Sequence, residues 1–226
     1  MEPLQPERYY HVYNHGNAWD TVFCEDENYR FFMEKYLLHV SPVVNTYAYC
    51  LMPNHFHFFV RIKSLAEYLG ETGVEKIGAF LERSKNYKNL AADLTNINFS
   101  KVPDFRKVNF EEAWLAFVSK QYSNLFSSYT QAFNKKYARR GALFLSTFKR
   151  RMLTSSEFRN MLLYIVCNPV HHGFVSNPFD WKYSEPKGPD VVFPGLDLSM
   201  ANDLFDGYSD LKYALINNRY QQIEEE

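Results

Sequence analysis

Apolar and polar positions alternate along several short segments, which predicts a set of strands. Residues 8–15 alternate as a strand does and stop at Gly16. Residues 43–52 are apolar on both faces, as a central strand is, and Pro53-Asn54 makes a tight reversal into a third strand over 55–62. The first half of the chain therefore contains a strand hairpin. A fourth strand is expected over 142–153.

Apolar residues at helical spacing predict the helices between these strands. One helix begins with Asp26 as its cap and ends before Pro42, and a long one covers about 111–137. A last helix follows the Thr154–Glu157 capping-box pattern and ends at Asn168-Pro169. Between them, 64–110 is interpreted as an insertion with one helix around 74–87.

The order strand, helix, strand, strand, helix, strand is that of the ferredoxin-like split βαβ unit. We expect an α+β fold with an antiparallel sheet, helices on one face, and an additional C-terminal helix. The chain then divides into a domain over 1–184 and an acidic extension over 185–226. With 226 residues, 46% of them hydrophobic, it is long enough for a substantial core.

Composition excludes several classes of protein. No apolar run approaches the roughly 18 residues that a membrane helix needs, and the N-terminus lacks a signal-peptide pattern, which indicates a soluble, cytoplasmic protein without a membrane partner. The cysteines Cys24, Cys50 and Cys167 lack metal-type spacing and are expected to be reduced thiols.

Two histidines on one predicted strand are the first candidate for chemistry. His55 and His57 project to the same face, whereas Phe56, Phe58 and Val60 form an apolar face opposite. We expect the apolar face to pack on the core and the imidazoles to lie on the face away from it. Two imidazoles can hold one cation and leave positions open for water and phosphate oxygens, which favours a catalytic metal.

The residues Leu51-Met-Pro-Asn-His-Phe-His57 resemble the His-hydrophobe-His motif of the single-tyrosine HUH transposases, and in particular the REP-associated tyrosine transposases. The resemblance runs from Tyr10-His-Val-Tyr-Asn-His-Gly16 to Tyr164-Ile-Val-Cys-Asn-Pro-Val-His-His-Gly173, about residues 8–184. The chain departs from the family pattern at Val166, where a histidine is expected, and in the 64–110 insertion. Both departures concern substrate details more than chemistry.

The resemblance implies a DNA strand transferase with endonuclease activity that works through a covalent 5′-phosphotyrosine and a free 3′-hydroxyl. Among 17 tyrosines, Tyr164 matches the family motif and lies roughly 130° from the centre of the last helix's apolar stripe. Tyr122 and Tyr129, on the apolar stripe of the preceding helix, are the alternatives. A phenol has a pKa of about 10, so a divalent metal would help its attack.

The resemblance also offers Asn168 as a third metal ligand, four residues after Tyr164. Because a residue before proline is pushed out of helical geometry, Asn168 is equally well interpreted as the cap of the helix. Two imidazoles and an amide oxygen suit Mg²⁺ or Mn²⁺, although Zn²⁺ or Ni²⁺ could bind in a test tube. His11 and His15, on the first strand, are candidates for supporting contacts or phosphate contacts, whereas a polar turn explains His171 and His172.

Charge is segregated along the chain although the net charge is −1. A stretch over 134–156 has no acidic residue, and six acids lie between 185 and 210. We expect the basic stretch to bind single-stranded or hairpin DNA, the alternative being a solvated edge. Its cations are Lys135, Lys136, Arg139, Arg140, Lys149, Arg150 and Arg151.

Three functions compete. The first is the metal-dependent nicking and joining enzyme, with its site built within one chain or across a homodimer. The second is a DNA-hairpin-binding regulator or maintenance protein that has kept the fold without mobility. The third is a metal hydrolase that uses bound water and never becomes attached to DNA.

Overall fold

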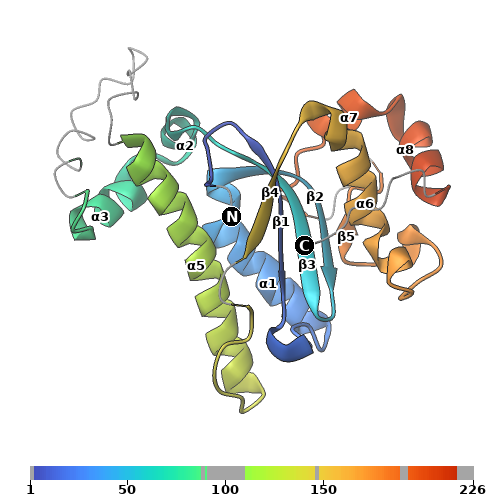
Figure 1. Cartoon of the computed structure of the whole chain (residues 1–226), viewed down its shortest axis with the longest axis horizontal. Helices are drawn as coiled ribbons and strands as arrows, with labels where there is room; N and C mark the ends of the chain where they lie inside the picture. The colour runs from blue at the N-terminus through green and yellow to red at the C-terminus, as the bar shows by residue number, and fades with distance from the viewer. Residues whose placement is uncertain (1–2, 88–89, 91–109, 146–147, 189–192, 218–226) are drawn as a thin grey trace.

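A computed structural model of the chain describes residues 3–87, 90, 110–145, 148–188 and 193–217 (Figure 1). Its centre is a five-stranded antiparallel sheet with the order β4-β1-β3-β2-β5. The strands are β1 (Tyr9–His15), β2 (Val44–Met52), β3 (His55–Ile62), β4 (Lys149–Leu153) and β5 (Ser184–Glu185). The first four have the ferredoxin-like order 4-1-3-2, which confirms the expected fold class.

Helices cover both faces of this sheet (Figure 1). On one face lie α1 (Asp26–His39) and α5 (Phe110–Lys136), packed against Phe56, Phe58 and Val60 of β3. On the other face α6 (Phe158–His171) lies against β2 and β3 and is itself covered by α7 (Ser199–Leu204) and α8 (Gly207–Ile216). The sheet therefore separates two hydrophobic cores, and the additional helix lies opposite the first two.

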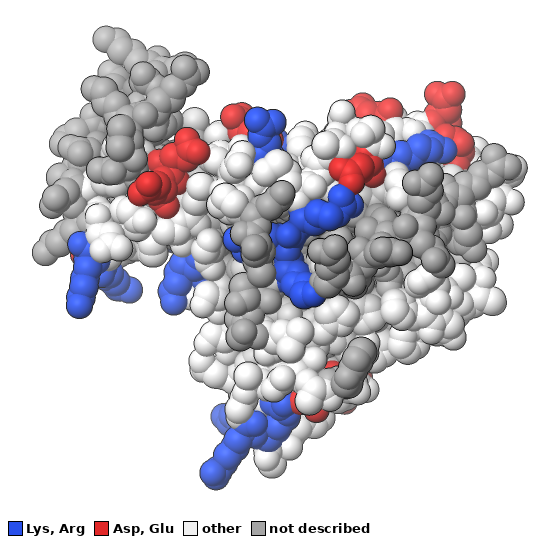
Figure 2. Space-filling model, in the orientation of Figure 1, with Lys and Arg blue, Asp and Glu red and all other residues white. Residues whose placement is uncertain are grey.

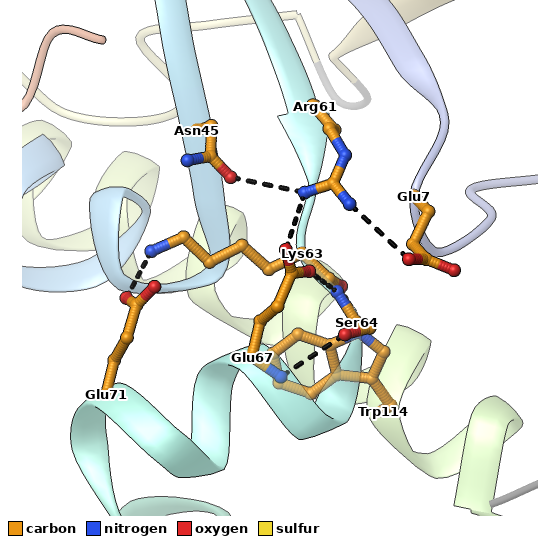
Figure 3. Close-up of polar contacts among 8 residues, drawn as sticks. All are labelled: Glu7, Asn45, Arg61, Lys63, Ser64, Glu67, Glu71 and Trp114. Atoms are coloured by element: carbon orange, nitrogen blue, oxygen red, sulfur yellow. Dashed lines mark hydrogen bonds and ion pairs between the residues drawn. The ribbon is translucent and has the colours of Figure 1, made fainter.

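The expected insertion begins with two short helices, not one. They are α2 (Leu65–Thr72) and α3 (Glu75–Arg83), and residues 88–89 and 91–109 of the expected insertion lie outside the described part of the chain. The polar residues in Figure 3 attach α2 to the end of β3. Arg61 pairs with Glu67 at 3.0 Å, and the Trp114 indole N–H of α5 donates to the Lys63 carbonyl at 2.9 Å. These contacts join the insertion to the core.

Three element boundaries differ from the sequence prediction. The fourth strand covers only Lys149–Leu153, because Phe144 forms an isolated bridge to Gly16 instead of a continuous ladder. The N-cap of α1 is Glu25, not Asp26, since Asn28 completes a capping box with Glu25. The last helix passes through Pro169 and reaches His171. The helix continues for two residues beyond Pro169, although proline has no N–H to donate to the Ile165 carbonyl.

The described parts of the chain add three further findings. None of the described helices is long and apolar enough to cross a lipid bilayer. The three cysteines are free thiols, with Cys50 and Cys167 buried and Cys24 exposed, not buried as the other two are. Part of the expected acidic extension, residues 193–217, packs on α6 through side chains that include Phe205 and Leu215.

Candidate functional site

Strand β3 places His55 and His57 on the sheet face that α6 covers. Strand β1 pairs with β3 so that Tyr13 lies opposite His57 and His15 lies opposite His55. Tyr13 and His15 therefore lie on the same sheet face as the two histidines of β3. The expectation that this face lies away from a core is wrong, because α6 and the helices behind it build a second core there. His55 is 3% exposed and His57 is fully buried.

Helix α6 turns one stripe of side chains toward these histidines. Tyr164, Asn168 and His172 follow one another at intervals of four residues, so they lie along one side of the helix and its C-terminal end. The Tyr164 ring stands edge-on to His57 with 5.8 Å between ring centroids and to His11 with 5.9 Å. The His172 ring stands against His55 at 4.9 Å.

Tyr164 is 4% exposed, so its position off the expected apolar stripe does not mean that it faces solvent. Residues 161–169 of α6 are all buried, since the sheet lies on one side of the helix and α7 and α8 on another. Instead, the Tyr164 side chain extends away from the apolar stripe of α6 and toward the histidines. Sequence periodicity could identify the odd position of Tyr164 but not what covers it.

The ring nitrogens of the histidine pair have defined partners on one side. His55 Nδ1 donates to the Asn54 side-chain oxygen at 2.7 Å, and His57 Nδ1 lies 3.0 Å from His11 Nε2. A hydrogen on Nδ1 leaves the Nε2 lone pair of the same ring for coordination. His11 therefore contacts His57 through a ring nitrogen, and His15 stacks on His55 with 4.9 Å between centroids.

Asn168 is fully buried, and neither its amide oxygen nor its amide nitrogen has a hydrogen-bond partner among the described residues. A buried amide without partners costs about 1–3 kcal/mol, so a water molecule or a ligand on this stripe would stabilise it. The C-cap interpretation of Asn168 is wrong, because the residue lies inside α6 and its carbonyl accepts from the His172 N–H at 3.0 Å.

These donors fit a divalent cation. Among the described residues no group of three or more His, Cys, Asp or Glu side chains is arranged to hold a metal ion. The two imidazoles of β3 and the amide of Asn168, on the α6 stripe that faces them, offer neutral N and O donors. Such a set leaves room for water and phosphate oxygens around Mg²⁺ or Mn²⁺.

The alternative tyrosines lie in the other core, across the sheet from the histidines. Tyr122 stacks on Phe148 with 4.6 Å between centroids, and the Tyr129 hydroxyl donates to the Val22 carbonyl at 2.5 Å. Burial raises the pKa of both hydroxyls. The structure therefore gives both residues a place in the packing of α5.

The seven basic residues do not form one surface. Figure 2 shows Lys and Arg side chains over β4 and, apart from them, at the far end of α5. Near that end Lys136 pairs with Glu25 at 2.6 Å and with Glu27 at 2.5 Å, and Arg139 pairs with Asp20. These acids come from another part of the chain, so the acid-free stretch in the sequence is not acid-free in space.

The cations of β4 lie closer to the histidines. Lys149 is opposite Tyr13 and Arg151 is opposite His11, so both side chains belong to the histidine face of the sheet. The Lys149 ammonium lies 6.0 Å from the centre of the Tyr13 ring, whereas Arg151 pairs with Glu157. Arg150 points to the other face and lies 5.4 Å from the centre of the Phe148 ring.

Sequence reasoning missed His172, which it explained by a polar turn. The turn is correct, but the exposed His172 side chain also contacts His55. Its spacing of eight residues from Tyr164 was the available signal. His171 is exposed as well, and it contacts His172 with 5.5 Å between ring centroids.

Comparisons with known proteins give one similar fold to report. No protein-family model matches the chain, and no curated protein sequence matches it. Among solved structures, a similar chain is described as a REP-associated tyrosine transposase bound to a REP hairpin. The two chains are 12% identical over 81% of this chain and 79% of that one, with a TM-score of 0.47.

Proposed function

We propose that the protein is a metal-dependent DNA strand transferase, which cleaves and rejoins single-stranded or hairpin DNA through Tyr164. One observation carries the proposal. A helical tyrosine lies edge-on to His57, and the next turn of the same helix presents a buried amide without hydrogen-bond partners among the described residues. A nucleophile beside a set of metal donors is an arrangement that suits phosphoryl transfer to a side chain.

His55, His57 and Asn168 would hold the cation. When bound, it would supply positive charge that stabilises the phosphate during attack and offsets part of the cost of ionising a phenol. His11 and Asn54 would orient the two imidazoles by their contacts to Nδ1. This assignment gives a purpose to the polar residues that are buried between α6 and the sheet.

In the proposed reaction Tyr164 acts as the nucleophile. Its oxygen forms a bond to phosphorus while the bond from phosphorus to the 3′-oxygen breaks, so the number of phosphoester bonds is conserved. The reverse attack by a 3′-hydroxyl then rejoins a strand and releases Tyr164. Because Tyr164 is 4% exposed, its ring or α6 must move before DNA reaches it.

The DNA strand would approach along β4, because the cations on the histidine face come from this strand. Lys149 is opposite Tyr13, and Tyr13 is opposite His57 on the next strand. Neighbouring strands are about 4.8 Å apart, so Lys149 lies within about two nucleotides of the histidine pair. A phosphate beside the one that reacts could therefore contact Lys149.

Lys149→Gln tests this path. We expect a several-fold loss of affinity for hairpin DNA and a salt dependence whose log–log slope falls by about 0.7, as for one lost phosphate contact on a single strand. Lys135→Gln, at the end of α5, is the matched control and should leave the slope unchanged. Fluorescence anisotropy over a range of salt concentrations measures both, and the opposite result would place the DNA on α5.

A covalent-adduct assay tests the function itself. The protein is incubated with end-labelled hairpin DNA that carries single-stranded flanks, with Mn²⁺ or with chelator, and is then denatured and separated on a gel. We expect a band of protein attached to DNA only when metal is present. Metal-dependent cleavage without a band would favour the water-using hydrolase, and binding without cleavage across varied hairpins would favour the regulator.

A further inference from the structure

His172 lies at the opposite end of the site from Tyr164. Both belong to the stripe of α6 that faces the histidines, and eight residues of helix separate their Cα atoms by about 12 Å. Tyr164 contacts His57, His172 contacts His55, and the rings of His55 and His57 are 5.0 Å apart. Asn168 is between them on the stripe.

This order matters because attack on a phosphodiester is in line. The entering and leaving oxygens lie on opposite sides of phosphorus. If the phosphate lies over the histidine pair and Tyr164 attacks from one end, the leaving 3′-oxygen points toward the other end. His172 is the side chain of the stripe at that end, and it is exposed where Tyr164, Asn168 and His55 are buried.

We propose that His172 is a further catalytic residue, whose imidazole N–H donates a hydrogen bond to the departing 3′-oxygen. The inference rests on the proposed function. As the phosphorus to 3′-oxygen bond breaks, its electron pair goes to that oxygen, which ends as a hydroxyl with a proton from solvent. The Tyr164 phenol releases its proton to solvent, so the step is balanced and neither group is oxidised or reduced.

The test compares His172→Phe with the wild-type protein on two substrates in the same Mn²⁺ buffer. Phenylalanine keeps a ring against His55 and removes the donor. One substrate is the ordinary hairpin strand, and the other carries sulfur in place of the 3′-oxygen at the cleaved bond. A thiolate leaves readily and gains little from a hydrogen bond, so it reports whether His172 acts on the leaving atom.

We expect His172→Phe to slow cleavage of the ordinary strand on the order of 100- to 1000-fold, as the loss of one donor to a developing negative charge does. On the sulfur substrate the variant should lie within about threefold of wild type. His171→Phe, the exposed neighbour, should match wild type on both. In a Tyr164→Phe background, His172→Phe should leave DNA affinity and the Mn²⁺-dependent shift in melting temperature unchanged.

Three outcomes would overturn the inference and leave the function standing. Equal slowing on both substrates, or a lost Mn²⁺ shift, would mean that His172 only supports His55. Unchanged cleavage of the ordinary strand would remove any role in the reaction. If the wild-type protein cleaves neither substrate, the proposed function fails and takes the inference with it.

Discussion

Replacing Tyr164 by phenylalanine is expected to eliminate the covalent adduct and to reduce strand cleavage by at least about 10⁴-fold. The substitution removes one oxygen and keeps the ring that packs edge-on against His57 and His11. The fold, DNA affinity and metal affinity should therefore persist. Gel detection of the adduct and single-turnover cleavage with labelled DNA measure the two effects.

Tyr47→Phe is the matched control for this change. Tyr47 is 5% exposed and belongs to the same core beside α6, but it packs on Tyr9 and Phe59 instead of the histidine pair. The Tyr47→Phe variant loses the same phenolic oxygen on the same side of the sheet and should cleave DNA as the wild-type protein does. An adduct that persists in Tyr164→Phe would show that another residue is the nucleophile.

His57→Ala is expected to reduce cleavage on the order of 10³-fold and to eliminate metal-dependent stabilisation of the protein. A ligand at a hundred times its dissociation constant stabilises a folded protein by about 2.7 kcal/mol, and a variant without the site loses this increment. Thermal unfolding with and without Mn²⁺ measures it. The variant will also be less stable without metal, because His57 is fully buried and its removal leaves a cavity.

Comparing each variant with and without Mn²⁺ separates the loss of metal-dependent stabilisation from the lower stability of the metal-free protein. His39→Ala is the control, since His39 is on α1, across the sheet from the site. It should keep both the Mn²⁺ shift and cleavage. Asn168→Ala should weaken the Mn²⁺ shift, because it removes the proposed third donor. It also removes a buried amide that has no hydrogen-bond partner among the described residues. A full Mn²⁺ shift in His57→Ala would exclude this histidine pair as the metal site.

The enclosure of the site bears on how these variants are interpreted. His55, His57, Tyr164 and Asn168 are all nearly or fully buried, and α7 and α8 pack behind α6. If the proposed function is correct, DNA has to displace part of this packing or enter from the end marked by His172. Variants that change the packing of α6 could therefore alter cleavage without any contact to DNA, which is why Tyr164→Phe is paired with Tyr47→Phe from the same core.

The sequence by itself determined the order of elements and the pairing of β2 with β3. Two-residue alternation places His55 and His57 on one face, and that local rule holds whatever packs there. Helical spacing likewise separated Tyr164 from the apolar stripe of its helix. Local rules failed at Pro169, where the helix continues to His171 although proline has no N–H for the Ile165 carbonyl.

Only the tertiary structure decided which elements and side chains contact one another. Three features depend on contacts between residues far apart in the chain. Helix α6 covers the histidine face, and His172 contacts His55. Lys136 and Arg139 pair with Asp20, Glu25 and Glu27. Periodicity records which way a side chain points from its own element. It carries no information about the element that lies opposite, because that follows from the packing of whole surfaces.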